Sequence, residues 1–285
     1  MSWQPTTLTR FIQGFPSSAR TALVETDTGL GYLKAMGGPE GPHTLASEVV
    51  ATQLAEWFGL STFDWAILEL DEIDEVPFLD SQGNQTGMAV PGPAFITRSE
   101  SGSTWSGGKR ELKMLANPDD ISRLVVFDTW VLNCDRHSLP KNDPMGRPRI
   151  NRDNVFLSTD APHGQFALKA MDHTHCFTCG REWSRRLSNL ETVRDNRLFG
   201  CFPEFRSFLN RSAVVKAAAD LKRLERAVVA TMTAQIPVEW EVAQPALDAL
   251  VELVFQRAHF VADSIECKLW PQGDLFADTA EEPET

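Results

Sequence analysis

The sequence predicts an α+β fold of two lobes, in which a β-rich first third is followed by a mostly helical remainder. The first third alternates short apolar, β-branched runs with turn residues, a pattern that is typical of strands. Beyond a serine- and glycine-rich stretch, apolar residues recur at the three- and four-residue spacing of amphipathic helices. Two lobes joined in this way predict a ligand-binding cleft between them.

Changes in composition divide the chain into four segments. SESGSTWSGGK is poor in apolar residues and rich in serine and glycine, which indicates a flexible boundary. DLFADTAEEPET is acidic and is expected to be disordered. We therefore predict an N-lobe over residues 1–98, a flexible boundary over 99–109, a helical C-lobe over 110–272 and an acidic disordered tail over 273–285.

In the N-lobe, five strands and one helix are expected. The strands are predicted over 8–13, 20–27, 30–37, 64–73 and 88–98. Asp27, Thr28 and Gly29 suit a tight hairpin turn between the second and third strands. The helix is predicted over 44–60, because its apolar residues recur at helical spacing and Gly59 marks its end.

In the C-lobe, three long segments have helical periodicity. They span residues 121–133, 212–234 and 243–270. Two short apolar runs, 154–158 and 166–172, lie between the first and second of these helices and predict a hairpin.

Composition excludes several classes of function. The chain has 285 residues and a formal net charge of −12, so nonspecific binding to nucleic acid or to an anionic membrane is not expected. No apolar run approaches the roughly 20 residues that cross a bilayer, and the N-terminus lacks the pattern of a signal peptide. The five cysteines are sparse and odd in number, which favours reduced thiols in a cytoplasmic protein.

Lys34 stands near the end of an apolar strand. A buried ammonium group needs a negative partner, such as ATP phosphates or a carboxylate from a neighbouring helix. Glu48 borders the apolar stripe of the helix that follows and is the preferred partner, with Glu56 as the less favoured alternative. The competing interpretation is that lysine and glutamate both face solvent, as most charged residues do.

The loop GFPSSA at 14–19 separates the first two strands. Gly14, Ser17 and Ser18 leave backbone N–H groups accessible and add hydroxyl donors, so such a loop can hold phosphates. This loop alone is weak evidence for a phosphate site. The evidence is stronger because the strand pair that follows the loop ends in Lys34.

The polar stretch NCDRH, from 133 to 137, can carry the chemistry of phosphate transfer. That reaction needs a carboxylate to orient the attacking hydroxyl and oxygen ligands for Mg²⁺. Asp135 is the candidate base. Asn154 and Asp172 are the candidate metal ligands, because they stand at the two ends of the predicted hairpin, which brings them together.

The order of Lys34, Glu48, NCDRH, DNVFL and MDHT resembles the HipA-like kinase family, relatives of protein and phosphatidylinositol kinases. The resemblance spans roughly residues 8–180 and implies a protein-kinase-like fold and an ATP- and Mg²⁺-dependent phosphotransferase. It makes Lys34 the lysine on the ATP phosphates, with Glu48 as its partner. It makes Asp135 the catalytic base.

The resemblance also assigns the metal, the adenine contact and the class of acceptor. It implies that Asn154 and Asp172 hold Mg²⁺, that the loop 14–19 is the phosphate loop, and that backbone groups of 94–97 meet adenine. Phe95 and Ile96 are the central residues of that hinge segment. The acceptor that it suggests is a protein serine or threonine, and a separate antitoxin or regulatory partner would not be visible in this sequence. A small-molecule or lipid-type hydroxyl stays open as acceptor.

One feature departs from the family pattern. The asparagine usually follows the aspartate by about five residues, whereas Asn154 follows Asp135 by 19. Asn142 is nearer, but Asn154 is preferred because an apolar strand follows it, and 138–152 is interpreted as an insertion. Its basic residues are Lys141, Arg147, Arg149 and Arg152. They face either solvent or an anionic substrate, and the sequence does not decide between the two.

Three other functions compete with the kinase. HTHCFTC supplies His173, His175, Cys176 and Cys179, a zinc-compatible set that would need a further ligand such as Cys201 or His163. A noncatalytic nucleotide-binding module would be expected to have lost one of the kinase residues. A hydrolase with Cys134 as nucleophile is less favoured, because that cysteine has a packing explanation. His137 and His173 are expected to be structural, and Arg136 is expected to pair with a carboxylate.

Overall fold

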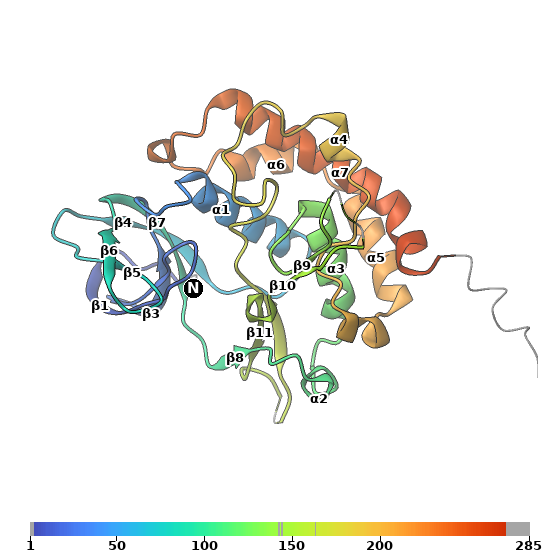
Figure 1. Ribbon diagram of the computed structural model, residues 1–285, viewed down its shortest axis with the longest axis horizontal. Coiled ribbons are helices and arrows are strands. Elements are labelled where there is room, and N and C mark those ends of the chain that lie inside the picture. Colours follow the sequence, from blue (N-terminus) through green and yellow to red (C-terminus); the bar gives the residue numbers. More distant parts are fainter. Residues whose placement is uncertain (1–2, 142, 144, 163, 272–285) are drawn as a thin grey trace, which may run out of the picture.

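The computed structural model describes residues 3–271 apart from 142, 144 and 163. Its β-rich N-terminal region and helical C-terminal region confirm the predicted α+β fold (Figure 1). The predicted tail over 273–285 and the alternative metal ligand Asn142 lie outside the described residues. No helix among the described residues is long and apolar enough to cross a membrane.

The N-terminal region is built on an antiparallel sheet of five strands in the order β1-β2-β3-β7-β4. These strands are β1 (Leu8–Gly14), β2 (Ala22–Thr26), β3 (Gly29–Lys34), β4 (Trp65–Leu70) and β7 (Gly92–Arg98), close to the predicted ranges. The predicted loop between β4 and β7 contains an additional hairpin of β5 (Pro77–Leu79) and β6 (Gln85–Met88). Leu79 of this hairpin packs against Gly14, at the end of β1.

Helix α1 (His43–Trp57) lies between the sheet and the helical region. Every residue from His43 to Ala55 is buried, because α1 contacts β7 on one side and α6 on the other. The predicted end of this helix is confirmed: the chain leaves it at Phe58, and Gly59 takes the positive φ of 76° that favours glycine.

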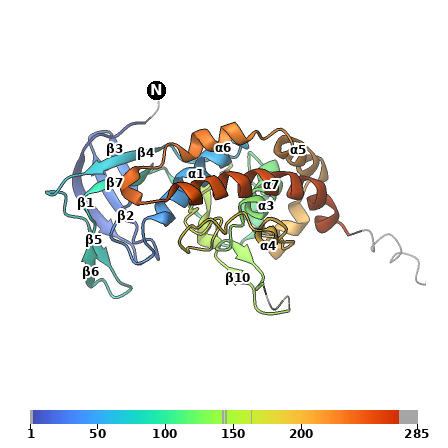
Figure 2. The same ribbon diagram turned by 90° about the horizontal axis from the view of Figure 1, so that it is seen from above.

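The helical region packs around α3 (Asp119–Val131) and α7 (Gln244–Leu269). Figure 2 shows the sheet at one end of the molecule and α7 running along the helical region. The smaller helices are α2 (Lys109–Leu112), α4 (Leu190–Val193), α5 (Arg211–Leu221) and α6 (Arg226–Thr233), and 3₁₀ turns cover Arg152–Asn154, Pro203–Phe208 and Val238–Trp240.

The prediction of one helix over 212–234 is wrong. The chain breaks between α5 and α6, and the two halves pack on different neighbours. Helix α5 contacts α3 and α7, whereas α6 contacts α1 and α7. No glycine or proline marks the break, so tertiary packing sets it and the local sequence does not.

Short strands connect the two regions. β8 (Gly102–Thr104), β11 (Val155–Ser158) and β12 (Ala167–Ala170) form a three-stranded sheet, and β9 (His137–Ser138) pairs with β10 (Arg149–Ile150). The hairpin of β11 and β12 was predicted. Residues 99–109, expected to be a flexible boundary, instead contain β8, which pairs with β11, and Trp105, which is buried. Burial of that tryptophan ties the stretch to the helical region.

Arg257 on α7 joins the ends of α3 and α4. Its side chain is fully buried, and its guanidinium donates to the carbonyl oxygens of Trp130 at 2.9 Å, Val193 at 3.0 Å and Asp195 at 3.2 Å. Burial lowers the pKa of this arginine from 12.5 to about 10. Carbonyls that end two helices are therefore satisfied by one side chain.

Replacing Arg257 by methionine is expected to destabilise the protein by about 3 kcal/mol, because several buried carbonyls lose their donor. For a chain of this size the change lowers Tm by roughly 6–12 °C. Thermal unfolding measures it. Arg226→Met is the matched control, since that arginine forms an exposed pair with Glu252 and its loss should change stability by less than about 1 kcal/mol. Equal effects of the two variants would contradict the role of Arg257.

Candidate active site

A cavity of about 600 Å³ lies between the sheet and the helical region. Its walls come from both parts of the chain. The sheet side and the loop after β1 contribute Phe15, Ser17, Ser18, Tyr32, Lys34, Glu48 and Phe95, and the helical side contributes Asp135, Arg149, Asn151, Asn154 and Asp172. Most of the residues singled out in the sequence therefore border one cavity.

Lys34 ends β3 and lines this cavity. Its ammonium forms a buried ion pair with Glu48 and donates to Asp172 Oδ1 at 2.9 Å. Burial alone would lower the pKa of Lys34, but the carboxylates of Asp172 and Glu48 outweigh burial and raise it. The lysine is therefore charged, and the predicted partner Glu48 is the one that it meets. Glu56 instead accepts from Trp65 Nε1 at 3.0 Å.

Glu48 also reaches across to the helical region. Its second oxygen accepts from the backbone N–H of His173 at 3.0 Å. The neighbouring Asp172 takes a positive φ of 56°, and its carboxylate accepts from Thr174 Oγ1 at 2.9 Å. Although burial raises it, the pKa of Asp172 is lowered by the charge of Lys34, so the carboxylate is ionised.

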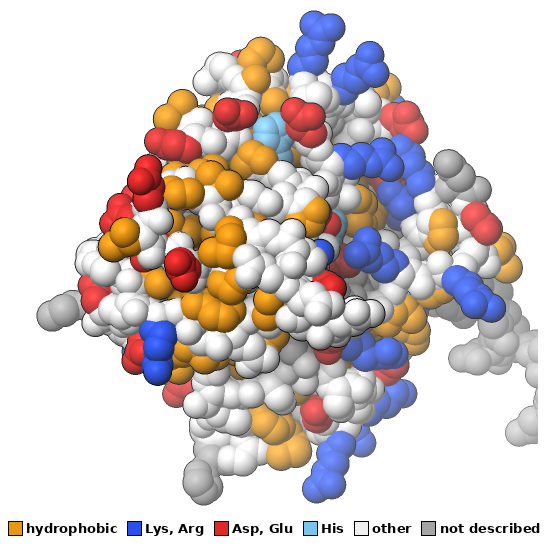
Figure 3. Space-filling view, turned by 60° about the vertical axis from the view of Figure 1, so that its left-hand side comes forward, with side chains coloured by type: hydrophobic (Ala, Val, Ile, Leu, Met, Phe, Trp, Pro, Cys, Tyr) orange, Lys and Arg blue, Asp and Glu red, His pale blue; other side chains and the backbone are white. Residues whose placement is uncertain are grey.

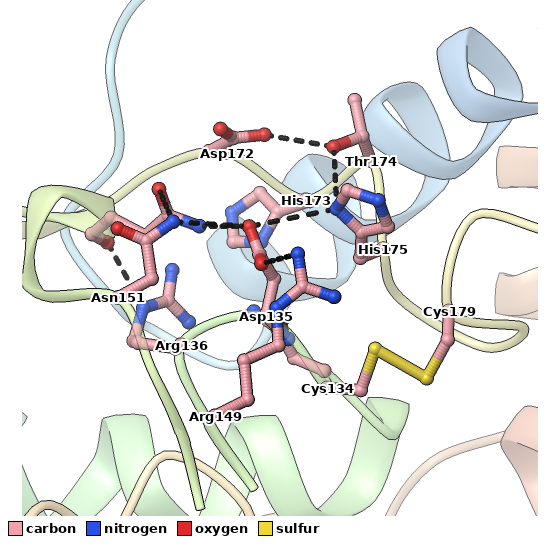
Figure 4. Close-up of polar contacts among 12 residues, drawn as sticks. Cys134, Asp135, Arg136, Arg149, Asn151, Asp172, His173, Thr174, His175 and Cys179 are labelled. Atoms are coloured by element: carbon pink, nitrogen blue, oxygen red, sulfur yellow. Dashed lines mark hydrogen bonds and ion pairs between the residues drawn. A yellow bond between two sulfur atoms is a disulfide. The ribbon is translucent and has the colours of Figure 1, made fainter. Parts of the chain in front are cut away.

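Asp135 follows α3 and is held by two amides and one arginine (Figure 4). Asn154 Nδ2 donates to its Oδ2 at 2.8 Å, and Asn151 Nδ2 donates to the same oxygen at 3.2 Å. Arg149, from β10, forms an ion pair with Oδ1. Burial raises the pKa of Asp135, but contacts with His175, Arg149 and Asn154 outweigh it and lower the pKa.

His175 links Asp135 to the loop that precedes α1. Its Nδ1 lies 3.5 Å from Asp135 Oδ2, and its Nε2 lies 3.0 Å from Glu40 Oε1. Burial lowers the pKa of this histidine, but the two carboxylates outweigh burial and raise it to about 9. The imidazolium therefore bridges the two regions across one edge of the cavity.

The charge on His175 predicts a pH-dependent stability. Its folded-state pKa of about 9 lies above the ordinary 6.5, so the stabilisation is complete below pH 6.5 and is lost as the pH rises through 9. At about 1.4 kcal/mol per unit, up to about 3 kcal/mol is involved. We expect wild type to exceed His175→Gln in unfolding free energy at pH 6 and to approach it above pH 9. Urea unfolding at several pH values measures this, and a constant difference would contradict it.

A buried ion pair supports the loop that carries Asp135. Arg136 pairs with Asp128 of α3, and both side chains are fully buried. Arg136 also donates to the carbonyl oxygens of Asn154 at 2.9 Å and Met171 at 2.6 Å. The expected pairing of Arg136 with a carboxylate is confirmed, and one guanidinium sets the distance between the segments that carry Asp135, Asn154 and Asp172.

Two of the predicted binding residues lie elsewhere. Gly14 packs against Leu79 and does not line the cavity. Ile96 is buried on the opposite face of β7, because side chains alternate along a strand, whereas its neighbour Phe95 does line the cavity. β7 is a central strand that pairs with β3 and β4, so the backbone of 94–97 is engaged in the sheet. Ser17 and Ser18 line the cavity as predicted.

The sequence interpretation did not predict the contacts that Arg149, Asn151 and His175 make with Asp135, nor the contact of Glu40 with His175. Asn151 had a visible signal, because N-R-D-N places a second asparagine three residues before Asn154. The other three act through contacts that no local pattern records. Arg149, for example, reaches Asp135 only because β10 pairs with β9.

The oxygens of Asp172 and Asn154 fit Mg²⁺ in kind, since that ion prefers one or two carboxylate or amide oxygens together with phosphates and water. Among the described residues, no group of three or more His, Cys, Asp or Glu could hold a metal alone. The zinc alternative is not supported, because His175 pairs with two carboxylates and Cys179 is bonded to another cysteine. His163, one of its further ligands, lies outside the described residues.

A disulfide joins Cys134, beside Asp135, to Cys179 (Figure 4). The sequence predicted free thiols, and the structure differs for this pair. The pair was not evident because 45 positions separate the cysteines, and the turn after Asp172 brings them together. Cys176, Cys201 and Cys267 are free.

Comparisons with known proteins agree with this geometry. The sequence profile of a family described as HipA-like kinase matches residues 25–180, more than half of the chain. A structure of the Helicobacter pylori proinflammatory kinase CtkA is similar, with a TM-score of 0.54 and 13% identity over 93% of this chain and 99% of that chain. A Golgi casein kinase gives a TM-score of 0.52 and 10% identity over 93% of this chain and 75% of that chain. These likenesses confirm the kinase-like fold. No curated protein sequence matches the chain.

Proposed function

The chain belongs to the HipA-like kinase family, and we propose that it transfers the γ-phosphate of ATP, with Mg²⁺, to a serine or threonine hydroxyl of a protein. Family and fold support a phosphotransferase in general. The observation that carries the finer proposal is the convergence of Lys34, Glu48, Asp135, Asn154 and Asp172 on one cavity between the two regions.

Lys34 is proposed to hold the ATP phosphates. Its ammonium is charged and fixed by Glu48, so it needs little rearrangement to meet an anion. Ser17 and Ser18 line the same cavity from the loop after β1 and are proposed to donate to the phosphates. Phe95 and Tyr32 add aromatic surface that suits a nucleobase.

Asp135 is proposed to orient the acceptor hydroxyl and to accept its proton. Asn154 and Asn151 both donate to Oδ2, which fixes the carboxylate and leaves Oδ1 to the ion pair with Arg149. The pKa of Asp135 is lowered, so the carboxylate is ionised at neutral pH. Positioning and electrostatics supply most of the catalysis in phosphoryl transfer, and these contacts support both.

Asp172 and Asn154 are proposed to hold Mg²⁺. When bound together with ATP, the ion would neutralise charge on the phosphates and orient them. Asp172 shares one oxygen between Lys34 and Thr174. Asn154 turns its amide nitrogen toward Asp135, and its carbonyl oxygen, which accepts from Asn151 Nδ2 at 3.1 Å, is the candidate ligand. A separate regulatory protein, as the family resemblance suggests, is a further part of the proposal and needs its own search.

Intact-mass analysis tests the proposal. Purified protein is incubated with γ-labelled ATP and Mg²⁺, with and without a cell extract as acceptor. Label is expected on protein in the complete reaction, with loss of the signal when EDTA removes the metal. Labelled serine or threonine after acid hydrolysis would support a protein acceptor, and label only on small molecules would contradict it. No transfer and no ATP turnover would contradict the kinase itself.

A further inference from the structure

Arg149 forms an ion pair with Oδ1 of Asp135, the oxygen to which the two asparagines do not donate. The arginine comes from β10, within the insertion between Asp135 and Asn154, and its side chain is 53% exposed while that of Asp135 is 7% exposed. Asp135 Oδ1 has no hydrogen-bond donor among the described residues and has only this ion pair. An acceptor hydroxyl that approaches Oδ1 must therefore displace Arg149 or share the oxygen with it.

Further exposed arginines stand in the same segment as Arg149 and in the segment that follows His175. We call the five residues Arg147, Arg149, Arg181, Arg185 and Arg186 the basic rim. All five are exposed, and within the part of the chain that the structure describes only Arg149 has a carboxylate partner. Figure 3 shows most Lys and Arg side chains of this face gathered along one side, whereas acidic side chains lie both among them and on the other side.

The rim comes from two segments of the chain, and Arg149 is its member that lines the cavity. Arg147 and Arg149 stand in the segment that ends in the β9–β10 pair. Arg181 directly follows Gly180, which lies against the ring of His175, and His175 contacts Asp135. Arg185 and Arg186 follow Trp183, whose backbone N–H donates to His43 at the start of α1 at 2.7 Å. Asp135 thus contacts the segment of Arg149 directly and the segment of Arg181 through His175.

This arrangement is unusual for the composition of the chain, which carries 39 acidic and 27 basic residues and a formal net charge of −12. Unpaired cations around an anionic base attract anionic groups and repel cationic ones. An acceptor with carboxylates beside its hydroxyl offers Arg149 a new partner when the arginine leaves Oδ1. A basic acceptor would meet like charges on both sides.

We propose that the acceptor is an acidic peptide segment, in which carboxylates flank the phosphorylated hydroxyl and bind Arg149 and the rest of the basic rim. This rests on the proposed kinase function and adds a substrate class to it. An extended peptide fits better than a small anion, because the rim is divided between Arg149, which lines the cavity, and four exposed arginines that do not line it. Arg149 is in this view a specificity-determining residue.

The test uses three fluorescent peptides that share a central serine and differ only in flanking Glu, Gln or Lys residues. Phosphate transfer and binding by fluorescence polarisation are both measured on the full-length protein. Wild type is expected to favour the Glu peptide over the Gln peptide by about tenfold, the size of one or two rim ion pairs. Arg149→Gln should reduce that ratio several-fold. Arg149→Glu with Arg181→Glu should reverse the preference toward the Lys peptide.

Lys216→Glu is the matched control, because this lysine is exposed on α5, has no ion pair among the described residues and lies far from the cavity. Its peptide preference should equal that of wild type. Equal use and equal binding of the three peptides by wild type would overturn the inference. An equal loss of transfer to all peptides in Arg149→Gln, with unchanged ratios, would overturn it as well and assign the arginine to ATP.

The two measurements separate this inference from the proposed function. Binding preference for the Glu peptide, lost in Arg149→Gln, supports the acidic partner even where no phosphate is transferred. Absence of ATP hydrolysis and of transfer to every peptide would then contradict the kinase alone. Phosphate transfer to all three peptides without a charge preference would agree with the proposed kinase activity but would overturn the inference of an acidic acceptor.

Discussion

Asp135→Asn is expected to lower the rate of phosphate transfer by roughly 10²–10⁴-fold, the usual contribution of a general base. The amide cannot accept the proton of the acceptor hydroxyl, and it removes the charge that Asn154, Arg149 and His175 now surround. ATP affinity should change little, because Asp135 faces the acceptor side in the proposed mechanism. Steady-state transfer at saturating ATP, together with nucleotide binding by calorimetry, measures both.

Asp153→Asn is a close control for this variant. Asp153 lines the same cavity and stands next to Asn154, but it is exposed and contacts Thr104 at 3.3 Å, not Asp135. Transfer should stay within a few-fold of wild type. Comparable losses in the two variants would mean that the cavity needs negative charge in general, and Asp135 would lose its assignment as base.

Lys34→Met is expected to lower transfer by about 10²–10³-fold, because a fixed cation on the phosphates is removed from a water-poor site. It should also destabilise the protein by about 3–5 kcal/mol, since Glu48 is left buried without its partner. Transfer kinetics and urea unfolding are measured in parallel. The loss of stability complicates the interpretation of the loss of transfer, because a variant that is partly unfolded loses activity whatever the role of Lys34.

A double variant separates the two effects. Lys34→Met with Glu48→Gln removes the uncompensated charge and should recover much of the lost stability, as neutral replacements of buried pairs often do. Activity should stay low. Recovery of both stability and transfer would show that the lysine acts only on the fold, and it would contradict the phosphate-binding role.

Those elements of the site that rest on local pattern could be predicted from the sequence. Lys34 was singled out because it is a charged residue at the end of an apolar strand. Glu48 was singled out because it borders the apolar stripe of a helix, and the structure pairs the two. The ends of a hairpin identified Asn154 and Asp172. In each case the periodicity of a helix or strand, or a nearby turn, determines where the side chain points. The position of such a side chain can therefore be predicted from the sequence alone.

Elements that depend on distant partners could not be predicted. The break between α5 and α6 carries no glycine or proline and follows from the helices on which each half packs. Arg149 is one of four basic residues in the insertion, and only the pairing of β9 with β10 directs it to Asp135. The disulfide and the contact of His175 with Glu40 likewise join segments far apart in sequence.

The burial of α1 bears on how such an enzyme could be switched. Glu48 holds Lys34 with one oxygen and the backbone of His173 with the other, and the neighbouring His43 and Ser47 accept from Trp183. An outward movement of α1 would break all of these contacts at once and would expose its buried side chains to solvent. In this structure the lysine–glutamate pair is already formed, and the helix that carries Glu48 is buried. We therefore expect any control of this protein to act on the exposed segments that carry Arg149 and Arg181, because a movement of α1 would cost all of these contacts.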